Sequence, residues 1–275
     1  MNDGNGRAGP LDRLGASFAR ARAEGRGHLI IYVTAGDPDL DTTAELVPGL
    51  AQAGVDAVEL GIPFSDPLAD GPIIQAAAQR ALERGCTVRG VLECVRQIRE
   101  KTELPLAFMT SYNPILRMGP EEFVARSTEA GIDGMLVTDL PPSEAGDWVG
   151  LLEARSMKSI FLVAPSSTPE RVALATRLST GFVYCVSRPG VTGVRDDLPE
   201  ELTGLVARIR EATARPIAVG FGVSNAEHVR KVCAIADSAI VGSAMVRTIA
   251  EAQGRDQVLL AAIAFARELG SGRAP

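Results

Sequence analysis

The feature that most constrains the fold of this chain is a repeated alternation of short apolar runs with stretches of helical periodicity. About eight apolar runs occur along the 275 residues, and each is followed by a helical stretch. The runs are continuously apolar rather than alternating, which is typical of parallel strands covered on both faces. Eight such units close into a barrel, so the sequence predicts an α/β fold, a (β/α)8 TIM barrel in one domain over residues 1–275.

The expected elements follow from apolar runs and from the Gly, Pro, Asn and Asp residues that end them. Strands are expected at Leu29–Thr34, Val55–Leu60, Leu104–Thr110, Gly134–Thr138, Ser159–Val163, Phe182–Val186, Pro216–Val219 and Ser238–Val241. Helices are expected at Asp41–Ala53, Ile73–Glu83, Val88–Lys101, Glu121–Ala130, Glu144–Ala154, Pro169–Arg177, Glu200–Ala212, from Asn225, and as one long helix from Ser243. An extra N-terminal helix at Leu11–Glu24 could cap the bottom of the barrel, and residues 1–10 are expected to be disordered.

Composition narrows the class of protein. An apolar fraction of 46% with 23% charged residues is that of a water-soluble globular chain. No secretory signal and no run near the ~18 apolar residues of a membrane span is visible, so we expect a cytoplasmic protein without a membrane partner. The four cysteines form no C-x-x-C pair and are expected to be reduced thiols. A net charge of −6 argues against nucleic acid as a partner.

In a (β/α)8 barrel the active site lies at the carboxyl ends of the strands, which excludes several chemistries here. His28 precedes the first expected strand and His228 lies within a helix, so histidine ligands for a metal are not available and no metal is expected. Lys101, Lys158 and Lys231 are also misplaced, which disfavours a Schiff-base aldolase. Acid–base chemistry therefore falls to carboxylates.

Five acids and one tyrosine remain at the correct end of the barrel: Asp37, Glu59, Asp66, Asp70, Asp139 and Tyr184. Glu59 is the strongest candidate because it lies inside an apolar strand, where burial raises the pKa of a carboxyl toward a value that suits proton transfer. Asp70 follows it in the loop. A structural reading stays open, in which Glu59 pairs with an arginine and the Asp-Pro steps only form turns. Asp56, at the entry of the same strand, is set aside because it points to the other face.

Glycine-rich loops follow the last three strands. They include Gly190–Gly193, Gly220–Ser224 and the pair Gly242-Ser243, which opens a helix. Bare backbone N–H groups and a helix N-terminus bind phosphate without a basic side chain, so adjacent loops of this kind indicate a phosphate site. Each glycine taken alone could equally mark a tight turn.

Several motifs carry a resemblance to a known family. They are GDP at Gly36–Pro38, ELGIPFSDPLADGPIIQ at Glu59–Gln75, SYNPI at Ser111–Ile115, VTDLP at Val137–Pro141, SRPGVTG at Ser187–Gly193 and GFGVS at Gly220–Ser224. From about Leu11 to Leu269 the chain resembles the tryptophan synthase α subunit family. The resemblance implies a barrel that cleaves indole-3-glycerol phosphate by retro-aldol chemistry to indole and glyceraldehyde 3-phosphate.

The resemblance also implies roles for individual residues. It makes Glu59 the general acid–base and Asp70 the second catalytic carboxylate, with Thr192 in a loop that closes over the substrate and Asp66 at a subunit contact. The implied phosphate ligands are Gly193, Gly222, Gly242 and Ser243. The implied indole pocket is Tyr32, Met109, Leu136, Leu162, Tyr184 and Phe221.

The family resemblance implies a partner and no cofactor in this subunit. The expected partner is a tryptophan synthase β subunit that carries pyridoxal phosphate, in an α2β2 complex through which indole passes. Two positions depart from the family pattern: Ser111 stands where Tyr is common, and Tyr32 where Phe is frequent. We expect both to affect packing rather than the mechanism.

Two other functions remain open on sequence alone. Another phosphate-binding barrel, such as a sugar-phosphate epimerase, would keep the glycine loops but would not need the pair Glu59 and Asp70. A catalytically silent barrel that only regulates its partner would keep all the motifs, because a fold and its motifs do not prove activity.

Overall fold

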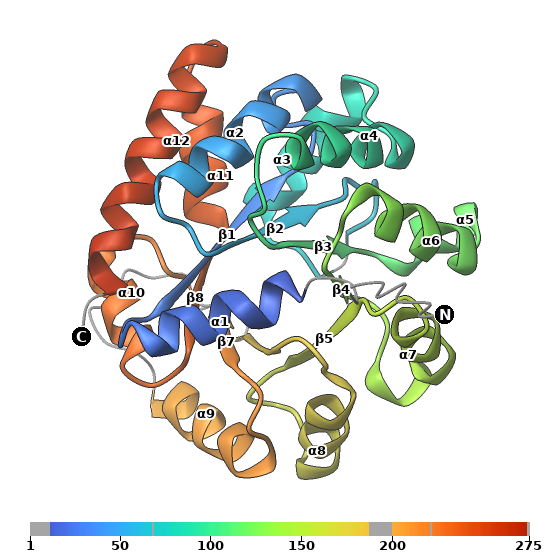
Figure 1. Cartoon of the computed structure of the whole chain (residues 1–275), viewed down its shortest axis with the longest axis vertical. Helices are drawn as coiled ribbons and strands as arrows, with labels where there is room; N and C mark the ends of the chain where they lie inside the picture. The colour runs from blue at the N-terminus through green and yellow to red at the C-terminus, as the bar shows by residue number, and fades with distance from the viewer. Residues whose placement is uncertain (1–11, 68, 187–199, 221, 274–275) are drawn as a thin grey trace, which may run out of the picture.

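The computed structural model describes residues 12–67, 69–186, 200–220 and 222–273. Eight parallel strands pair in sequence order, and β1 closes the ring on β8 (Figure 1). The strands are β1 (His28–Thr34), β2 (Ala57–Gly61), β3 (Leu106–Thr110), β4 (Gly134–Val137), β5 (Lys158–Val163), β6 (Val183–Val186), β7 (Ile217–Gly220) and β8 (Ser238–Val241). The expected (β/α)8 TIM barrel is confirmed.

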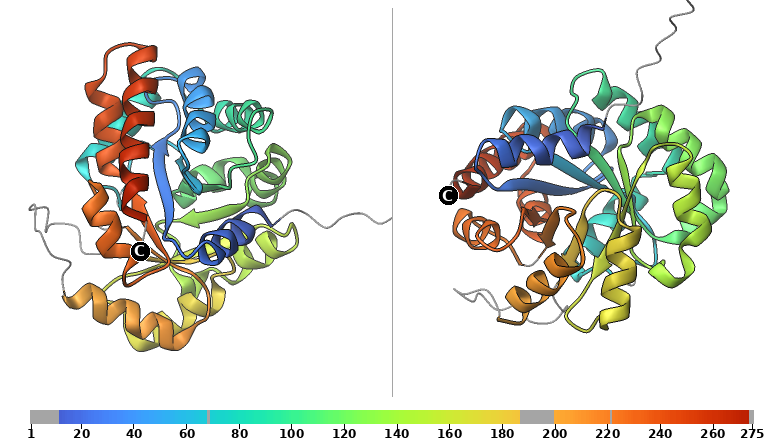
Figure 2. Two further views of the ribbon diagram at one scale, coloured as in Figure 1. Left: turned by 60° about the vertical axis from the view of Figure 1, so that its left-hand side comes forward. Right: turned by 60° about the horizontal axis from the view of Figure 1, so that its bottom comes forward.

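The helices form a layer around this barrel (Figures 1 and 2). They are α1 (Arg13–Ala23), α2 (Leu40–Gln52), α3 (Pro72–Glu83), α4 (Val88–Arg99), α5 (Tyr112–Met118), α6 (Pro120–Ala130), α7 (Gly146–Glu153), α8 (Pro169–Leu178), α9 (Glu200–Ala212), α10 (Ala226–Cys233), α11 (Ser243–Glu251) and α12 (Arg255–Gly270). Short 3-10 turns lie at Pro142–Glu144 and Ser271–Arg273. The last helix, α12, lies along α2, so the end of the chain packs beside its beginning (Figure 2).

Successive side chains of each strand point to opposite faces of the sheet, which gives two apolar layers. One face of the strands packs against the helices and forms the larger core cluster, which includes Leu60 and Phe108. The other face points into the barrel, where Ile30, Ala57 and Ile240 belong to a separate cluster. The barrel interior is therefore filled with side chains, as is usual for eight strands.

Helix α1 closes the amino-terminal end of the barrel, as the sequence suggested (Figure 1). Leu14 and Phe18 on its inner face join the interior cluster. The Phe18 ring stacks on His28 with centroids 4.0 Å apart. These apolar residues lie four apart on one helix face, so α1 covers the opening with a continuous apolar strip.

The same pair of hydrogen bonds recurs at the start of every second strand. The residue one position before an even-numbered strand, or three positions before it at β6, donates its backbone N–H to a carbonyl of the preceding odd-numbered strand. Its side chain in turn accepts the backbone N–H of the residue that carries that carbonyl. The four pairs are Leu29 with Asp56, Leu106 with Asp133, Ser159 with Thr180, and Ile217 with Asp237. We call these four pairs the strand latches.

Arginines neutralise the three aspartates of the strand latches. Three of these arginines belong to α1 or to the turn after it. Arg13 lies 3.1 Å from Asp133, Arg22 lies 3.5 Å from Asp237, and Arg26 lies 2.8 Å from Asp56. Each aspartate also binds a second arginine from elsewhere in the chain, which is Arg99, Arg210 or Arg273. The N-terminal helix is thus attached to the barrel both by its apolar strip and by ion pairs to three of the four latches.

Three sequence expectations were wrong in detail. A short helix, α5, follows β3, where the sequence analysis expected no helix; Pro114 fits there because a proline in the first turn of a helix costs no hydrogen bond. The expected long helix from Ser243 is two helices, separated at Gly254, whose φ of 82° a helix cannot contain. His28 does not precede the first strand but is its first residue.

Candidate active site

Glu59 occupies the middle of β2 and points into the barrel. Ala57, two residues earlier, belongs to the interior cluster, and alternate side chains of a strand share a face. Glu59 is 1% exposed, and neither of its carboxylate oxygens has a hydrogen-bond partner in the described structure. A buried carboxyl without partners is costly, so the presence of Glu59 here indicates a use other than stability.

The other acids at this end of the barrel have structural partners or face solvent. Asp37 is held by two nitrogens of Arg80, at 2.9 and 2.6 Å. Asp139 accepts the backbone N–H of Tyr112 at 2.7 Å, where α5 begins. Asp66 is exposed. The alternative in which Glu59 pairs with an arginine is therefore wrong within the described residues; an arginine neutralises Asp37 instead.

Burial changes the acidity of both remaining carboxyls. Desolvation, with a smaller contribution from the negative charge of Asp70, raises the pKa of Glu59 to about 8. Desolvation alone raises the pKa of Asp70 to about 6. At neutral pH Glu59 thus holds its proton while Asp70 is mostly ionised, which assigns one carboxyl as proton donor and the other as fixed negative charge.

A small cavity of about 10 Å³ lies beside Asp70 and is also lined by Tyr32 and Met109. Ser111 also lines it, together with three threonines that the sequence analysis did not single out: Thr34, Thr110 and Thr138. The cavity has room for about one water molecule, so a larger ligand requires side chains or the loop to move. Thr110 ends β3 and Thr138 follows β4, so the rule that sites lie at strand ends could have found them had it been applied to hydroxyls.

The apolar residues expected around an indole ring lie together inside the barrel. Met109, Leu136, Leu162 and Tyr184 belong to the interior cluster or pack against it. Tyr32 packs with Met109 in a neighbouring cluster near α3 and α11. Their side chains come from five strands, β1, β3, β4, β5 and β6.

Three of the four glycine and serine positions expected to bind phosphate lie within the described residues. Gly242 is the N-cap of α11, no side chain caps that helix, and Ser243 is exposed at its first position. Gly222 is exposed after β7 with a φ of 48°, a backbone conformation that suits glycine. The N–H groups of the first turn of α11 are therefore available to an anion. Thr192, Gly193 and Phe221, together with residues 1–10, lie outside the described residues.

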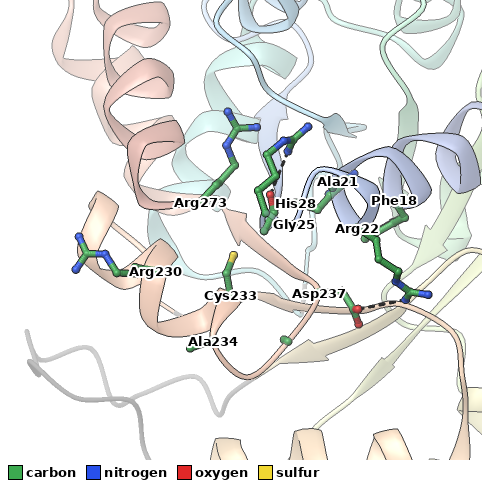
Figure 3. A pocket seen from close by; sticks show the side chains of 13 residues that line it. Phe18, Ala21, Arg22, Gly25, His28, Arg230, Cys233, Ala234, Asp237 and Arg273 are labelled. Carbon is green, nitrogen blue, oxygen red and sulfur yellow. Dashed lines mark hydrogen bonds and ion pairs between the residues drawn. The ribbon is translucent and has the colours of Figure 1, made fainter. Parts of the chain in front are cut away.

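A second cavity, of about 400 Å³, lies at the amino-terminal ends of the strands, the opposite end from Asp70 (Figure 3). Its lining includes Arg22, Arg26, Arg230 and Arg273. Each of these arginines forms an ion pair with an aspartate or glutamate. Their positive charges are therefore neutralised in part by acidic side chains of the protein. The cavity lies at the other end of the barrel and does not contribute to the site around Glu59.

The histidines and the basic residues of the sequence analysis lie away from Glu59. His28 is fully buried under α1, 3.0 Å from the Ser17 hydroxyl and 3.1 Å from that of Ser238, and burial lowers its pKa to about 4. His228 contacts Ser224 at the start of α10. Lys158 pairs with Asp12 of the N-terminal segment. Within the described residues, no three His, Cys, Asp or Glu side chains gather as a metal site, and no helix has the length and apolarity of a membrane span.

Comparison with known proteins identifies the family of this chain. The family model "Tryptophan synthase alpha chain" matches residues 18–272. The tryptophan synthase alpha chains of Opitutus terrae and Solibacter usitatus are each 45% identical to this chain, over 92% and 95% of it and over 96% and 98% of their own length.

Solved structures of the same family share the fold. Tryptophan synthase subunit alpha from Legionella pneumophila matches with a TM-score of 0.88 and 33% identity, covering 95% of this chain and 98% of that one. A tryptophan synthase structure from M. tuberculosis matches with a TM-score of 0.85 and 35% identity, covering 95% and 99%. The chain therefore belongs to the tryptophan synthase alpha chain family, lyases that cleave indole-3-glycerol phosphate in tryptophan biosynthesis.

Proposed function

We propose that Glu59 and Asp70 carry out the cleavage of indole-3-glycerol phosphate to indole and glyceraldehyde 3-phosphate in this chain. The observation that supports this most is the unpartnered, buried carboxyl of Glu59 beside an ionised Asp70. Glu59 is the general acid–base, and Asp70 is the fixed negative charge. A site with these two acids facing an apolar pocket favours this reaction over that of a sugar-phosphate epimerase, which would not require an aromatic pocket.

The proposed mechanism uses one carboxyl for two proton transfers. Protonated Glu59 gives its proton to C3 of the indole ring, which makes the ring a cation. Asp70 stabilises the positive charge that develops on the indole N–H. The Glu59 carboxylate then takes the proton of the adjoining glycerol hydroxyl as the C–C bond breaks, and the bonding electrons return to the ring. Indole and the aldehyde leave, and Glu59 is protonated again.

The indole ring and the phosphate of the substrate are each assigned to residues of suitable chemistry. We place the indole ring among Tyr32, Met109, Leu136, Leu162 and Tyr184, with Phe221 as a further contact. We place the phosphate at the N-terminus of α11, on Gly242 and Ser243, with Gly222 and Gly193 close by. Thr192 belongs to a loop that closes over the bound substrate and excludes water.

The proposal extends to a partner subunit. The chain acts as the α subunit of a cytoplasmic α2β2 complex, in which a β subunit holds pyridoxal phosphate and receives indole. We place Asp66, which is exposed on the loop after β2, at the contact with that subunit. No cofactor is needed in the α subunit itself, because proton transfers and charge stabilisation suffice for the cleavage.

One assay separates the candidate functions. The purified chain is incubated with indole-3-glycerol phosphate, and both released indole and bound substrate are measured. Release of indole that is lost in the Glu59→Gln variant supports the proposal. Binding without release identifies a catalytically silent barrel, and neither binding nor release favours another phosphate-binding barrel. Substantial cleavage by Glu59→Gln would remove Glu59 from the mechanism.

The partner is tested separately. Adding the cognate β subunit is expected to increase the rate of cleavage, because loops that order on assembly complete the closed site. An unchanged rate at saturating β subunit would contradict the proposed complex. A β subunit that lacks the cognate interface serves as the control for crowding of the assay.

A further inference from the structure

The cavity of about 400 Å³ at the amino-terminal ends of the strands has the size of a small-molecule site (Figure 3). Its walls come from four segments: α1, the turn that leads into β1, the end of α10 with the turn after it, and the 3-10 turn at Ser271–Arg273. We call it the basal cavity. A ligand bound there would contact segments that lie far apart in the sequence.

The basal cavity has an apolar floor and a basic mouth. Phe18, Ala21 and Ala236 line it and are buried. The side chains of Arg22 on α1 and Arg230 on α10 also line it, and they are 69% and 54% exposed. These two arginines lie on opposite sides of the cavity (Figure 3). Guanidinium groups at the mouth of an apolar cavity suit a ligand with a small uncharged body and anionic groups.

The arginines of this region outnumber the acids that pair with them. Two aspartates each serve two arginines: Asp56 serves Arg26 and Arg273, and Asp237 serves Arg22 and Arg210. Both aspartates also accept a backbone N–H in a strand latch. Glu24 pairs with Arg26, and Glu227 pairs with Arg230. These ion pairs join five arginines to four acids, so a positive charge remains at the basal cavity.

Three arginines of the basal cavity also keep N–H groups that bond no described residue. Arg22 donates to Asp237 through Nη2 alone, and Arg230 donates to Glu227 through Nη1 alone. Arg273 donates through Nε and Nη1, which leaves Nη2. A guanidinium carries five N–H groups and binds a carboxylate or phosphate through two of them at once. An anion can therefore bind here while the ion pairs within the protein persist.

We propose that the basal cavity binds a small organic anion with at least two negative charges, of the phosphate or polycarboxylate class, through Arg22, Arg230 and Arg273. Two anionic groups are needed because Arg22 and Arg230 lie on opposite sides of the cavity (Figure 3). The uncharged part of the ligand packs on the apolar floor. The bound anion joins α1 to α10 and to the last described turn, and it stabilises the folded chain because it binds that state alone.

The test measures binding and its location together. The purified chain is titrated with pyrophosphate and, separately, with citrate, at an ionic strength held constant with sodium chloride because salt screens such contacts. Alkylation of Cys233 by N-ethylmaleimide reports on the cavity, since Cys233 lines it and the other three cysteines are buried. At ten times Kd we expect alkylation to slow about tenfold and Tm to rise by about 3–6 °C. A response to one anion alone assigns the ligand to that class.

Variants test the arginines. The double variant Arg22→Gln, Arg230→Gln should weaken binding tenfold or more, because hydrogen bonds from two charged groups are lost. The matched control is Arg126→Gln on α6, whose side chain is likewise exposed and pairs with Glu122 of its own helix. This variant should keep the native Kd.

Three results would overturn the proposal. They are no protection of Cys233 by either anion up to about 10 mM, equal protection in the double variant, and a rise in Tm without protection of Cys233. The last result would place the anion elsewhere, for example at the N-terminus of α11. Cleavage of indole-3-glycerol phosphate enters none of these measurements, so their outcome is independent of the proposed function.

Discussion

Glu59 and Tyr32 are paired in register on adjacent strands, and the carboxyl of the first is buried with no hydrogen-bond partner. The folded protein therefore holds an acid whose pKa is raised from 4.5 to about 8. Between these pH values the unfolded chain has already lost this proton and the folded chain has not. Glu59 thus lowers the stability of the fold as pH rises through this window, and the loss is complete above about pH 8.

We predict that Glu59→Gln raises the free energy of unfolding at pH 8 by about 1–3 kcal/mol and changes it little at pH 5, because glutamine carries no charge to desolvate. Urea unfolding at the two pH values measures this. Glu129→Gln, at an exposed position of α6, is the control for the substitution itself. A variant no more stable than the native chain at pH 8 would show that the Glu59 charge is already compensated.

The rate of cleavage should have a bell-shaped pH profile. We expect kcat/KM to rise as Asp70 ionises, with a pKa of about 6, and to fall as Glu59 loses its proton, with a pKa of about 8. The phosphate of the substrate also titrates near pH 6. Asp70→Asn distinguishes the two, because it should remove the acidic limb along with most of the activity. An acidic limb that persists unchanged in this variant belongs to the phosphate.

The phosphate assignment predicts opposite effects of one substitution on binding and on stability. Ser243→Asp places a negative charge at the first position of α11. It should raise KM about tenfold or more by repelling the phosphate, while it stabilises the helix by about 0.3–1 kcal/mol. Steady-state kinetics and thermal unfolding measure the two quantities. Ser243→Asn, neutral and of the same size, is the control, and an equal KM in both variants would place the phosphate elsewhere.

At the other end of the barrel, Asp56 should matter for stability alone. Its carboxylate is 2% exposed and accepts hydrogen bonds from Arg26, Arg273 and the N–H of Leu29. Asp56→Asn removes the carboxylate charge that faces Arg273 and leaves Arg26 with Glu24 alone, and it is expected to cost about 3–5 kcal/mol. Urea unfolding tests this, and kcat of the folded fraction should stay at the native value. Asp66→Asn, at an exposed site, should change stability by less than about 0.5 kcal/mol.

Much of the fold was predictable from the sequence because the relevant signals are local. Continuous apolar runs ended by glycine or proline located all eight strands within about two residues. The break at Gly254 was missed because the residues on both sides of it continue a helical pattern. Helix α5 was missed because Asn113-Pro114 is as common in turns as at helix starts.

The candidate site was likewise predictable only in part from the sequence. Glu59 was found from its place in an apolar strand, and the structure adds that it has no partner, which no spacing in the sequence reveals. The ion pair between Arg80 and Asp37 joins two segments that are far apart in the sequence. The sequence therefore could not show that Asp37 has an arginine partner while Glu59 has none. Asp56 was set aside for catalysis, and the structure pairs it with Arg26, Arg273 and Leu29. Its structural role had a signal in the repeat of Val55-Asp56-Ala57 as Ile132-Asp133-Gly134 and Ala236-Asp237-Ser238.

The strand latches have a consequence for how the chain can be cut. Each latch joins an odd strand to the even strand that follows it, so the barrel consists of four two-strand units, each closed on itself at its amino-terminal end. New termini placed between units, for example between β4 and β5, break none of these bonds across the cut. New termini within a unit separate its two strands along the chain, so that the latch of this unit must form between segments that are no longer joined directly. Circular permutants and split halves should therefore assemble best when the cut follows an even strand.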